Sequence, residues 1–223
     1  MDAPGTSAAD YSRSLRDLAA LNQLTFTHSS TLRWLARATS GLPKDAAFSV
    51  LDVACGHGDL LRAIHRWAGR RGFRAALEGI DLSPRSAVEA NAATLAEMAI
   101  TYRIGDVFDY EPVPAPDFIV SSQFAHHLTD AELVVFLRWL DRHAAQGWFI
   151  ADLHRHAFAY YGFPWLARVA GWHRIVRMDG RISIARGFRR ADWQRLLAKA
   201  AVAAEVRWSF PFRWAVASRG PSA

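Results

Sequence analysis

VLDVACGHGDL, at residues 50–60, joins an apolar run to a loop with two glycines and to the start of an amphipathic segment. This succession is typical of the first βα unit of an open α/β sheet, where ligands bind beyond the carboxyl ends of the strands. Gly56 and Gly58 let the backbone turn sharply and approach a ligand where a Cβ would collide. The stretch therefore predicts a strand, a ligand-binding turn and a helix.

Five short apolar runs predict the strands that surround this turn. They are nearly continuous rather than alternating, as expected for parallel strands covered on both faces, and segments of helical period separate them. Strands that alternate with helices predict right-handed βαβ crossovers and a doubly wound α/β sheet. The runs are FSVLDVA (48–54), AALEGIDL (75–82), ITYRIGDV (100–107), PDFIVSSQ (116–123) and GWFIADL (147–153).

Three segments lie outside this alternation, and we expect them to complete a single domain over residues 1–223. A predicted hairpin of EVRWSF and FRWAVAS, with Pro211 in its turn, brings the mainly parallel, Rossmann-like sheet to seven strands. The expected divisions are an N-terminal helical cap (10–40), a core (48–153), an aromatic and basic helical lid insertion (155–189), and a C-terminal helix with the hairpin (190–223).

The charge is unevenly distributed along the chain. The net charge is +6, yet residues 150–223 hold 13 Arg and Lys against four Asp and Glu, while residues 1–149 hold 14 against 17. A basic C-terminal third suits nucleic acid, an anionic membrane surface or an acidic substrate. It also fits a chain that simply uses Arg as its surface cation, because Arg supplies 25 of the 27 basic residues.

Cysteine usage and the N-terminus predict the compartment. Cys55 is the only cysteine, which excludes an internal disulfide framework and a cysteine-based metal cluster. Residues 1–14 lack a basic segment followed by an apolar one, and no run of 18 apolar residues occurs. We expect a soluble, cytoplasmic protein without a transmembrane segment; contact with a membrane surface stays open.

The acids around the loop distinguish between two kinds of cofactor. A dinucleotide loop reads G-x-G-x-x-G, but Leu61 stands at the third glycine position. Asp52 ends the strand just before the loop, where it would repel a pyrophosphate and suit the cationic amino and sulfonium groups of S-adenosylmethionine (SAM). Asp81 ends the second strand, where a carboxylate can accept both ribose hydroxyls of an adenosine, although Asp-Leu-Ser-Pro also caps a helix.

Three motifs together resemble the class I SAM-dependent methyltransferases: DVACGHG, GIDLSP and GDVFD. The resemblance implies that Asp106 bonds the adenine amino group, with Val107 and Phe108 beside the ring. Ala54 stands where the family usually has the first glycine of the loop. The expected cofactor-binding residues are Asp52, Ala54, Gly56, Gly58, Asp81, Leu82, Gly105, Asp106, Val107 and Gln123.

The fourth strand and its loop, IVSSQFAHHLTD (119–130), are expected next to the methyl group. Enzymes that methylate base amines carry an Asn/Asp-Pro-Pro-Tyr motif there, which this chain lacks. Cytosine C5 methylation needs a cysteine nucleophile, and Cys55 belongs to the cofactor loop. FAHHLTDAEL is instead similar to small-molecule methyltransferases of quinone biosynthesis.

Two histidines in this loop are the candidate catalytic residues. A phenol has a pKa near 10, so a positioned base aids its methylation, and His is suited to that task at neutral pH. We expect His126 to be the base, with His127 a weaker candidate. The alternative is that Thr129-Asp130 caps the next helix and both histidines pack at its entrance.

The lid insertion, DLHRHAFAYYGFPWLAR and the residues after it, resembles bacterial methyltransferases of polyketide and quinone pathways. In this fold it would cover the acceptor, although an aromatic surface helix packed on the core explains it as well. His154 and His156 lack a third ligand of suitable spacing, so no metal is expected. The candidate substrate residues are His28, His154, Tyr160 and Tyr161.

These features predict a SAM-dependent methyltransferase acting on a small aromatic or lipid-like acceptor, at a hydroxyl oxygen, with no nucleic acid partner. Two alternatives remain: an RNA or protein methyltransferase that uses the Arg-rich C-terminal third, and a SAM-binding module without turnover. Neither the acceptor nor the oligomeric state follows from the sequence.

Overall fold

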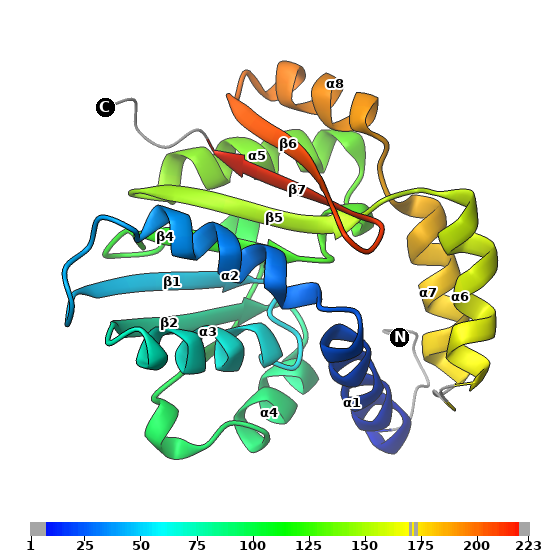
Figure 1. Ribbon diagram of the computed structural model, residues 1–223, viewed down its shortest axis with the longest axis horizontal. Coiled ribbons are helices and arrows are strands. Elements are labelled where there is room, and N and C mark those ends of the chain that lie inside the picture. The colour runs from blue at the N-terminus through cyan, green and yellow to red at the C-terminus, as the bar shows by residue number, and fades with distance from the viewer. Residues whose placement is uncertain (1–7, 170, 172–173, 219–223) are drawn as a thin grey trace.

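A single seven-stranded sheet organises the computed structural model, which describes residues 8–169, 171 and 174–218 (Figure 1). The strand order is β3-β2-β1-β4-β5-β7-β6. The first five strands are parallel, and β7 runs antiparallel to both β5 and β6. The predicted doubly wound α/β sheet is confirmed. The strands are β1 (Ala47–Val53), β2 (Arg74–Asp81), β3 (Thr101–Ile104), β4 (Phe118–Ser122), β5 (Gly147–Leu153), β6 (Ala204–Ser209) and β7 (Arg213–Ser218).

Helices cover both faces of this sheet and the carboxyl ends of its parallel strands. The predicted N-terminal helical segment is two helices, because Phe26 between them adopts φ 50° and interrupts the helix. The α-helices are α1 (Ala8–Leu24), α2 (Thr27–Ala38), α3 (Asp59–Arg70), α4 (Pro84–Ala92), α5 (Asp130–His143), α6 (Ala157–Val169), α7 (Arg174–Arg186) and α8 (Arg190–Ala200). Short 3-10 turns are η1 (Ala96–Met98), η2 (Val107–Asp109) and η3 (Ala125–His127).

Two apolar layers hold the helices to the sheet. On one face, Trp34 of α2 packs against Phe118 and Phe149 with ring centroids 5.6 and 5.3 Å apart, next to the buried stripe of α3. On the other face, α5 and α8 bury Phe136 and Trp193. A sheet covered on both faces explains why the strands read as continuous apolar runs.

Local side-chain bonds set where several elements begin and end. Thr129 and Glu132 form a capping box, so α5 begins where the sequence predicts. The third strand is shorter than its apolar run, because the Asp106 carboxylate accepts a bond from Phe108 N and starts η2. The fourth ends at Ser122, since Gln123 adopts φ 58°.

Beyond the carboxyl ends of the parallel strands lie α1, α6 and α7 (Figure 1). Contacts join α6 to α7 and join α7 to both α1 and η3. The lid insertion is thus a pair of helices in its described part; residues 170, 172 and 173 lie outside the described residues, as do residues 219–223 of the C-terminal division. In the described part of the chain, no helix is long and apolar enough to cross a membrane.

Candidate active site

The loop that follows β1 has a backbone that only particular residues adopt easily. Ala54, Gly56 and Gly58 have φ of 57°, 51° and 72°. A Cβ on Gly58 would collide with the Tyr102 ring, and the φ of 72° also favours glycine at this position. A Cβ on Gly56 would meet nothing within 4 Å, which leaves that side of the loop open. Ala54 holds the left-handed conformation at a cost of roughly 1–2 kcal/mol.

Three carboxyl groups meet at this loop. Asp52 is 2% exposed, and burial, followed by the charges of Asp59 and Asp81, raises its pKa well above the usual range. Asp81 accepts bonds from Gly56 N at 2.9 Å and from Ser83 N at 2.9 Å, which tie the loop to the second strand. A cation placed beside these acids would relieve their repulsion. The loop therefore fits the cationic end of SAM.

The expected adenine-binding residues lie one strand further along the same edge. Val107 is buried, Leu82 is 71% exposed, and Gly105 continues β3 at the end that faces the loop after β2. Asp106 lines a hollow together with Ile80 and Gly105. These residues thus lie at the same ends of β2 and β3, and their contact with adenine stays a prediction.

A network of side chains that sequence reasoning did not foresee connects the N-terminal helices to this loop. The Asp59 carboxylate, at the start of α3, accepts bonds from Asn22 Nδ2 at 3.0 Å and is 2.9 Å from His28 Nε2. Although burial opposes the charge, these two bonds lower the pKa of Asp59 to about 2. Gln123 Nε2 donates to Asn22 Oδ1 at 2.7 Å. The only signal in the sequence is an acid in the first turn of a helix.

The turn between α1 and α2 has a second attachment, to the hairpin. Arg213 of β7 is buried and donates to Thr25 Oγ1, Thr27 Oγ1 and Pro211 O at 3.0, 2.6 and 3.1 Å. Burial lowers the pKa of Arg213, the charge of Asp152 raises it by a smaller amount, and the resulting pKa is about 10. The helical cap is thereby attached to the sheet at both the cofactor loop and β7.

His126 forms a buried pair with an acid from the next strand. Its Nδ1 lies 2.8 Å from Asp152 Oδ1, and its backbone N donates to Asp152 Oδ2 at 3.2 Å. The two side chains are 2% and 0% exposed, and His126 Nε2 is buried without a hydrogen-bond partner among the described residues. Buried polar atoms usually have a partner, so this nitrogen is a candidate for contact with a ligand.

The other candidate residues have different surroundings. His127 lies in η3 beside His126, with ring centroids 4.2 Å apart, and is more exposed. The His154 ring packs against Trp214, and burial, followed by the charges of His156 and Arg189, lowers its pKa. Tyr160 stacks under Arg181, whereas Tyr161 is 68% exposed on α6. The structure thus places His126 and His28 at the end of the sheet where the loop after β1 lies, but it leaves Tyr161 at the surface.

Cys55 has the surroundings of a structural residue. It is 6% exposed, and burial, followed by the charges of Asp52 and Asp81, raises the pKa of its thiol. A protonated, buried thiol is a poor nucleophile. Among the described residues, no three His, Cys, Asp or Glu side chains are grouped as metal ligands.

Comparisons of the sequence identify a domain family. Residues 50–147 match the family model described as a methyltransferase domain. Curated relatives are the trans-aconitate 2-methyltransferases of Mycobacterium tuberculosis and Mycolicibacterium gilvum, 32% and 31% identical over 111 and 100 residues. These alignments cover 49% and 44% of this chain, and the chain spans only 38% and 35% of those relatives.

Solved structures share the fold at low sequence identity. Magnesium protoporphyrin IX methyltransferase from Synechocystis PCC 6803 with bound SAH has TM-score 0.57 and 16% identity, over 100% of this chain and 90% of that one. Human N-acetylserotonin methyltransferase in complex with SAM has TM-score 0.64 and 13% identity, over 97% and 57%. A plantazolicin methyltransferase with SAH has TM-score 0.66 and 13% identity, over 92% and 88%.

Solved structures of this fold hold SAM or SAH, the kind of cofactor expected from the acids around the loop. Residues 50–147 thus match a methyltransferase-domain model, and the fold of the chain is similar to that of solved methyltransferases with bound SAM or SAH.

Proposed function

We propose that this protein transfers the methyl group of SAM to a hydroxyl oxygen of a small acceptor with a substantial aromatic or lipid-like surface. The observation that carries the proposal is the buried His126–Asp152 pair, whose Nε2 lacks a partner among the described residues at the edge where the cofactor loop lies. The methyltransferase-domain match supports methyl transfer, and the names of the curated relatives, trans-aconitate 2-methyltransferases, support a small acceptor.

The side chains around the loop would bind and orient the cofactor. Asp52 would face its cationic end, Asp81 would accept the ribose hydroxyls, and Asp106 would accept the adenine amino group. When bound, SAM supplies a methyl group already activated by the sulfonium. Alignment of the acceptor with that methyl group then accounts for much of the rate.

His126 would act as the general base. Asp152 accepts the Nδ1 proton in this assignment, so Nε2 has a free lone pair for the acceptor hydroxyl. We propose His127 as a weaker alternative, and His28, His154 and Tyr160 as acceptor contacts. Tyr161 would contact the acceptor only if α6 moves, because its side chain is exposed.

The His126–Asp152 pair favours a phenol or an enol over a carboxylic acid as the acceptor. A carboxyl group, such as those of the trans-aconitate in the relatives' names, has an ordinary pKa near 4 and is ionised at neutral pH. It needs no base, whereas a phenol with a pKa near 10 does.

A screen with SAM tests the acceptor class. Phenols, hydroxyquinones, pyrones and trans-aconitate would be compared by release of S-adenosylhomocysteine. We expect phenols or hydroxyquinones to react. Turnover of only highly charged acceptors would contradict the proposal.

The His126→Ala variant tests the base. Loss of a general base costs roughly 10²–10⁴ in rate, so turnover should fall at least about a hundredfold while SAM affinity stays nearly unchanged. The loss should shrink at high pH and with more acidic phenols, since an ionised nucleophile needs no base. His65→Ala, on α3, is the control. An equal loss for all acceptors at every pH would assign His126 to positioning instead.

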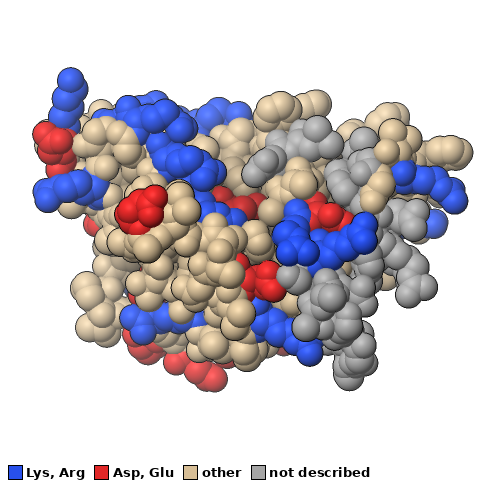
Figure 2. Space-filling view, turned by 90° about the horizontal axis from the view of Figure 1, so that it is seen from below, with Lys and Arg blue, Asp and Glu red and all other residues tan. Residues whose placement is uncertain are grey.

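We expect no nucleic acid partner. On the face in Figure 2, the basic side chains of the described residues are interspersed with acidic ones rather than gathered in one patch. Binding of RNA that weakens steeply with salt would favour the alternative, a methyltransferase that holds phosphate with its Arg-rich C-terminal third. SAM binding without turnover of any acceptor would favour a non-catalytic module.

A further inference from the structure

The two outermost strands of the sheet, β3 and β6, differ in how they are protected from pairing with another chain. At one edge, β3 has only four residues and is in contact with α4. At the other edge, β6 pairs with β7 over six consecutive residues without a bulge. Natural edge strands avoid pairing with other chains by being very short, by carrying charged side chains (Lys above all) or Pro, or by a bulge. Residues 204–209 contain no Pro, Lys or bulge, and the two charged side chains of β6, Glu205 and Arg207, have opposite signs, so they do not by themselves repel a second copy of the strand.

The charges on β6 complement those of a second, antiparallel copy. Glu205 and Arg207 are exposed, lie on the same face of the strand, and pair within the chain at 2.6 Å. If two copies of β6 lie antiparallel about an axis at Val206, each Glu205 stands opposite the Arg207 of the other copy. Opposite charges directly across a strand pair are favourable, and like charges there are unfavourable. In this register, four charged side chains of alternating sign surround the axis.

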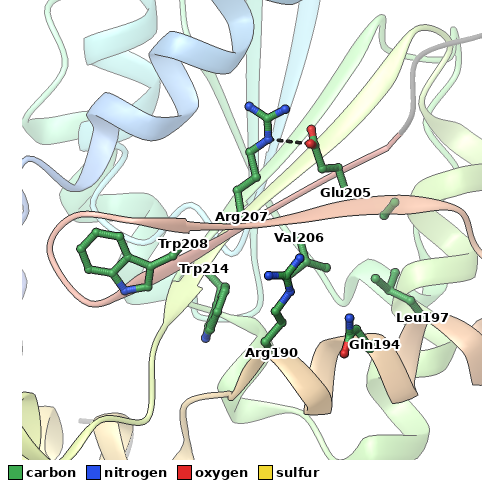
Figure 3. A pocket seen from close by; sticks show the side chains of 9 residues that line it. Arg190, Gln194, Leu197, Glu205, Val206, Arg207, Trp208 and Trp214 are labelled. Atoms are coloured by element: carbon green, nitrogen blue, oxygen red, sulfur yellow. Dashed lines mark hydrogen bonds and ion pairs between the residues drawn. The ribbon is translucent and has the colours of Figure 1, made fainter.

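The other face of β6 offers space and an aromatic side chain to fill it. A hollow of about 740 Å³ lies between α8 and the hairpin, lined by Leu197, Ala204 and Val206 among others. Figure 3 shows Glu205 and Arg207 on one side of β6, with Val206 on the side toward α8. Trp208 is 51% exposed. In the same register, the Trp208 of the second copy stands opposite Ala204, at the hollow.

We propose that two copies of this chain pair through β6 about an axis at Val206, so that one continuous sheet runs through both. The interaction would be isologous, since the same residues serve both sides. One strand pair and two Trp side chains form a small interface, so the dimer should be weak and populated at high protein concentration. The pairing is independent of the proposed methyl transfer.

Charge-swapped variants test the register. Sedimentation over roughly 1–500 µM should show that the wild-type protein self-associates, as expected for a small interface. In Glu205→Arg, both cross-strand pairs of residues 205 and 207 become Arg opposite Arg. In Arg207→Glu, both pairs become Glu opposite Glu. Because like charges then face each other, each variant alone should be monomeric. An equimolar mixture of the two should form a heterodimer, because opposite charges again face each other. The double variant E205R/R207E should dimerise like wild type.

Hydrogen exchange and SAM binding complete the design. Amides of residues 204–209 should gain protection as wild-type concentration rises, and those of the Glu205→Arg variant should not. Unchanged SAM affinity in both single variants would show that they are folded. A wild-type protein that stays monomeric at the highest concentration would overturn the proposal. So would single variants that dimerise like wild type, or a mixture that remains monomeric.

Discussion

Asp52 illustrates, at the scale of one residue, how a binding function opposes stability. Its raised pKa means that the ionised carboxylate is disfavoured in the folded protein, so its contribution to stability falls as pH rises from the usual carboxyl pKa to the raised pKa of the folded protein. Asp52→Asn should therefore raise the melting temperature at pH 7 without ligand, by roughly 2–4 °C for each kcal/mol relieved. The same variant should bind SAM more weakly.

Asp117 provides a matched control of opposite sign. Bonds from Ser49 lower the pKa of Asp117 although burial opposes the charge, so Asp117→Asn should lower the melting temperature at pH 7. Calorimetric scans with and without SAM compare the two variants. An Asp52→Asn protein that is less stable without ligand would refute the assignment of Asp52 as an uncompensated buried acid.

Asp81 combines two tasks in one carboxylate. It holds Gly56 N, and it is expected to accept the ribose hydroxyls. Asp81→Ala should weaken SAM binding by roughly 1.5–3 kcal/mol, the worth of hydrogen bonds to a charged group. Isothermal titration measures this change, and an affinity equal to that of the wild type would mean that the ribose lies elsewhere.

At the scale of elements, the attachment of α1 and α2 to the cofactor loop depends on Asp59. Its folded-state pKa of about 2 lies below the usual carboxyl value, so the stability that it contributes is present above about pH 4 and is lost as pH falls toward 2. The wild type should lose stability more steeply over this window than Asp59→Asn. Asp45→Asn, at an exposed position, is the control. Parallel acid denaturation curves for wild type and Asp59→Asn would show that the network does not hold the helices.

The helices beyond the strand ends should also respond to ligands. Residues 10–30 and the described part of residues 155–180 flank the ligand edge, and closure over a site excludes water. Their amides should exchange more slowly with deuterium when SAM and an acceptor bind. Protection confined to residues 50–110 would remove the support for a lid.

At the scale of the whole molecule, the fold alone does not select the cofactor, because dinucleotide enzymes use the same kind of sheet. We expect the acids around the loop to make the selection. SAM and S-adenosylhomocysteine should raise the melting temperature as their concentration increases, since a ligand that binds only the folded state stabilises it. NAD, whose pyrophosphate would lie near Asp52, should not. A shift with NAD and none with SAM would overturn the cofactor assignment.

The sequence by itself determined the architecture and the cofactor loop of this protein. Apolar runs and helical periods report burial directly, so the five parallel strands, the hairpin around Pro211 and the start of α5 at Thr129 could all be predicted. The positions of the loop glycines, Asp52 and Asp81 could be predicted as well, because they follow strands at fixed spacing and the carboxyl ends of parallel strands meet. Their contacts with the cofactor stay predictions.

Only the tertiary structure decided which side chains meet across that edge. The pairs His126–Asp152 and His28–Asp59 join residues 26 and 31 positions apart, and Arg213 reaches Thr25 over 188 positions. Such contacts depend on how elements pack and leave no local periodicity. Burial likewise sets the raised pKa of Asp52 and the lowered pKa of Asp59, because desolvation and nearby charges arise only when the chain is folded.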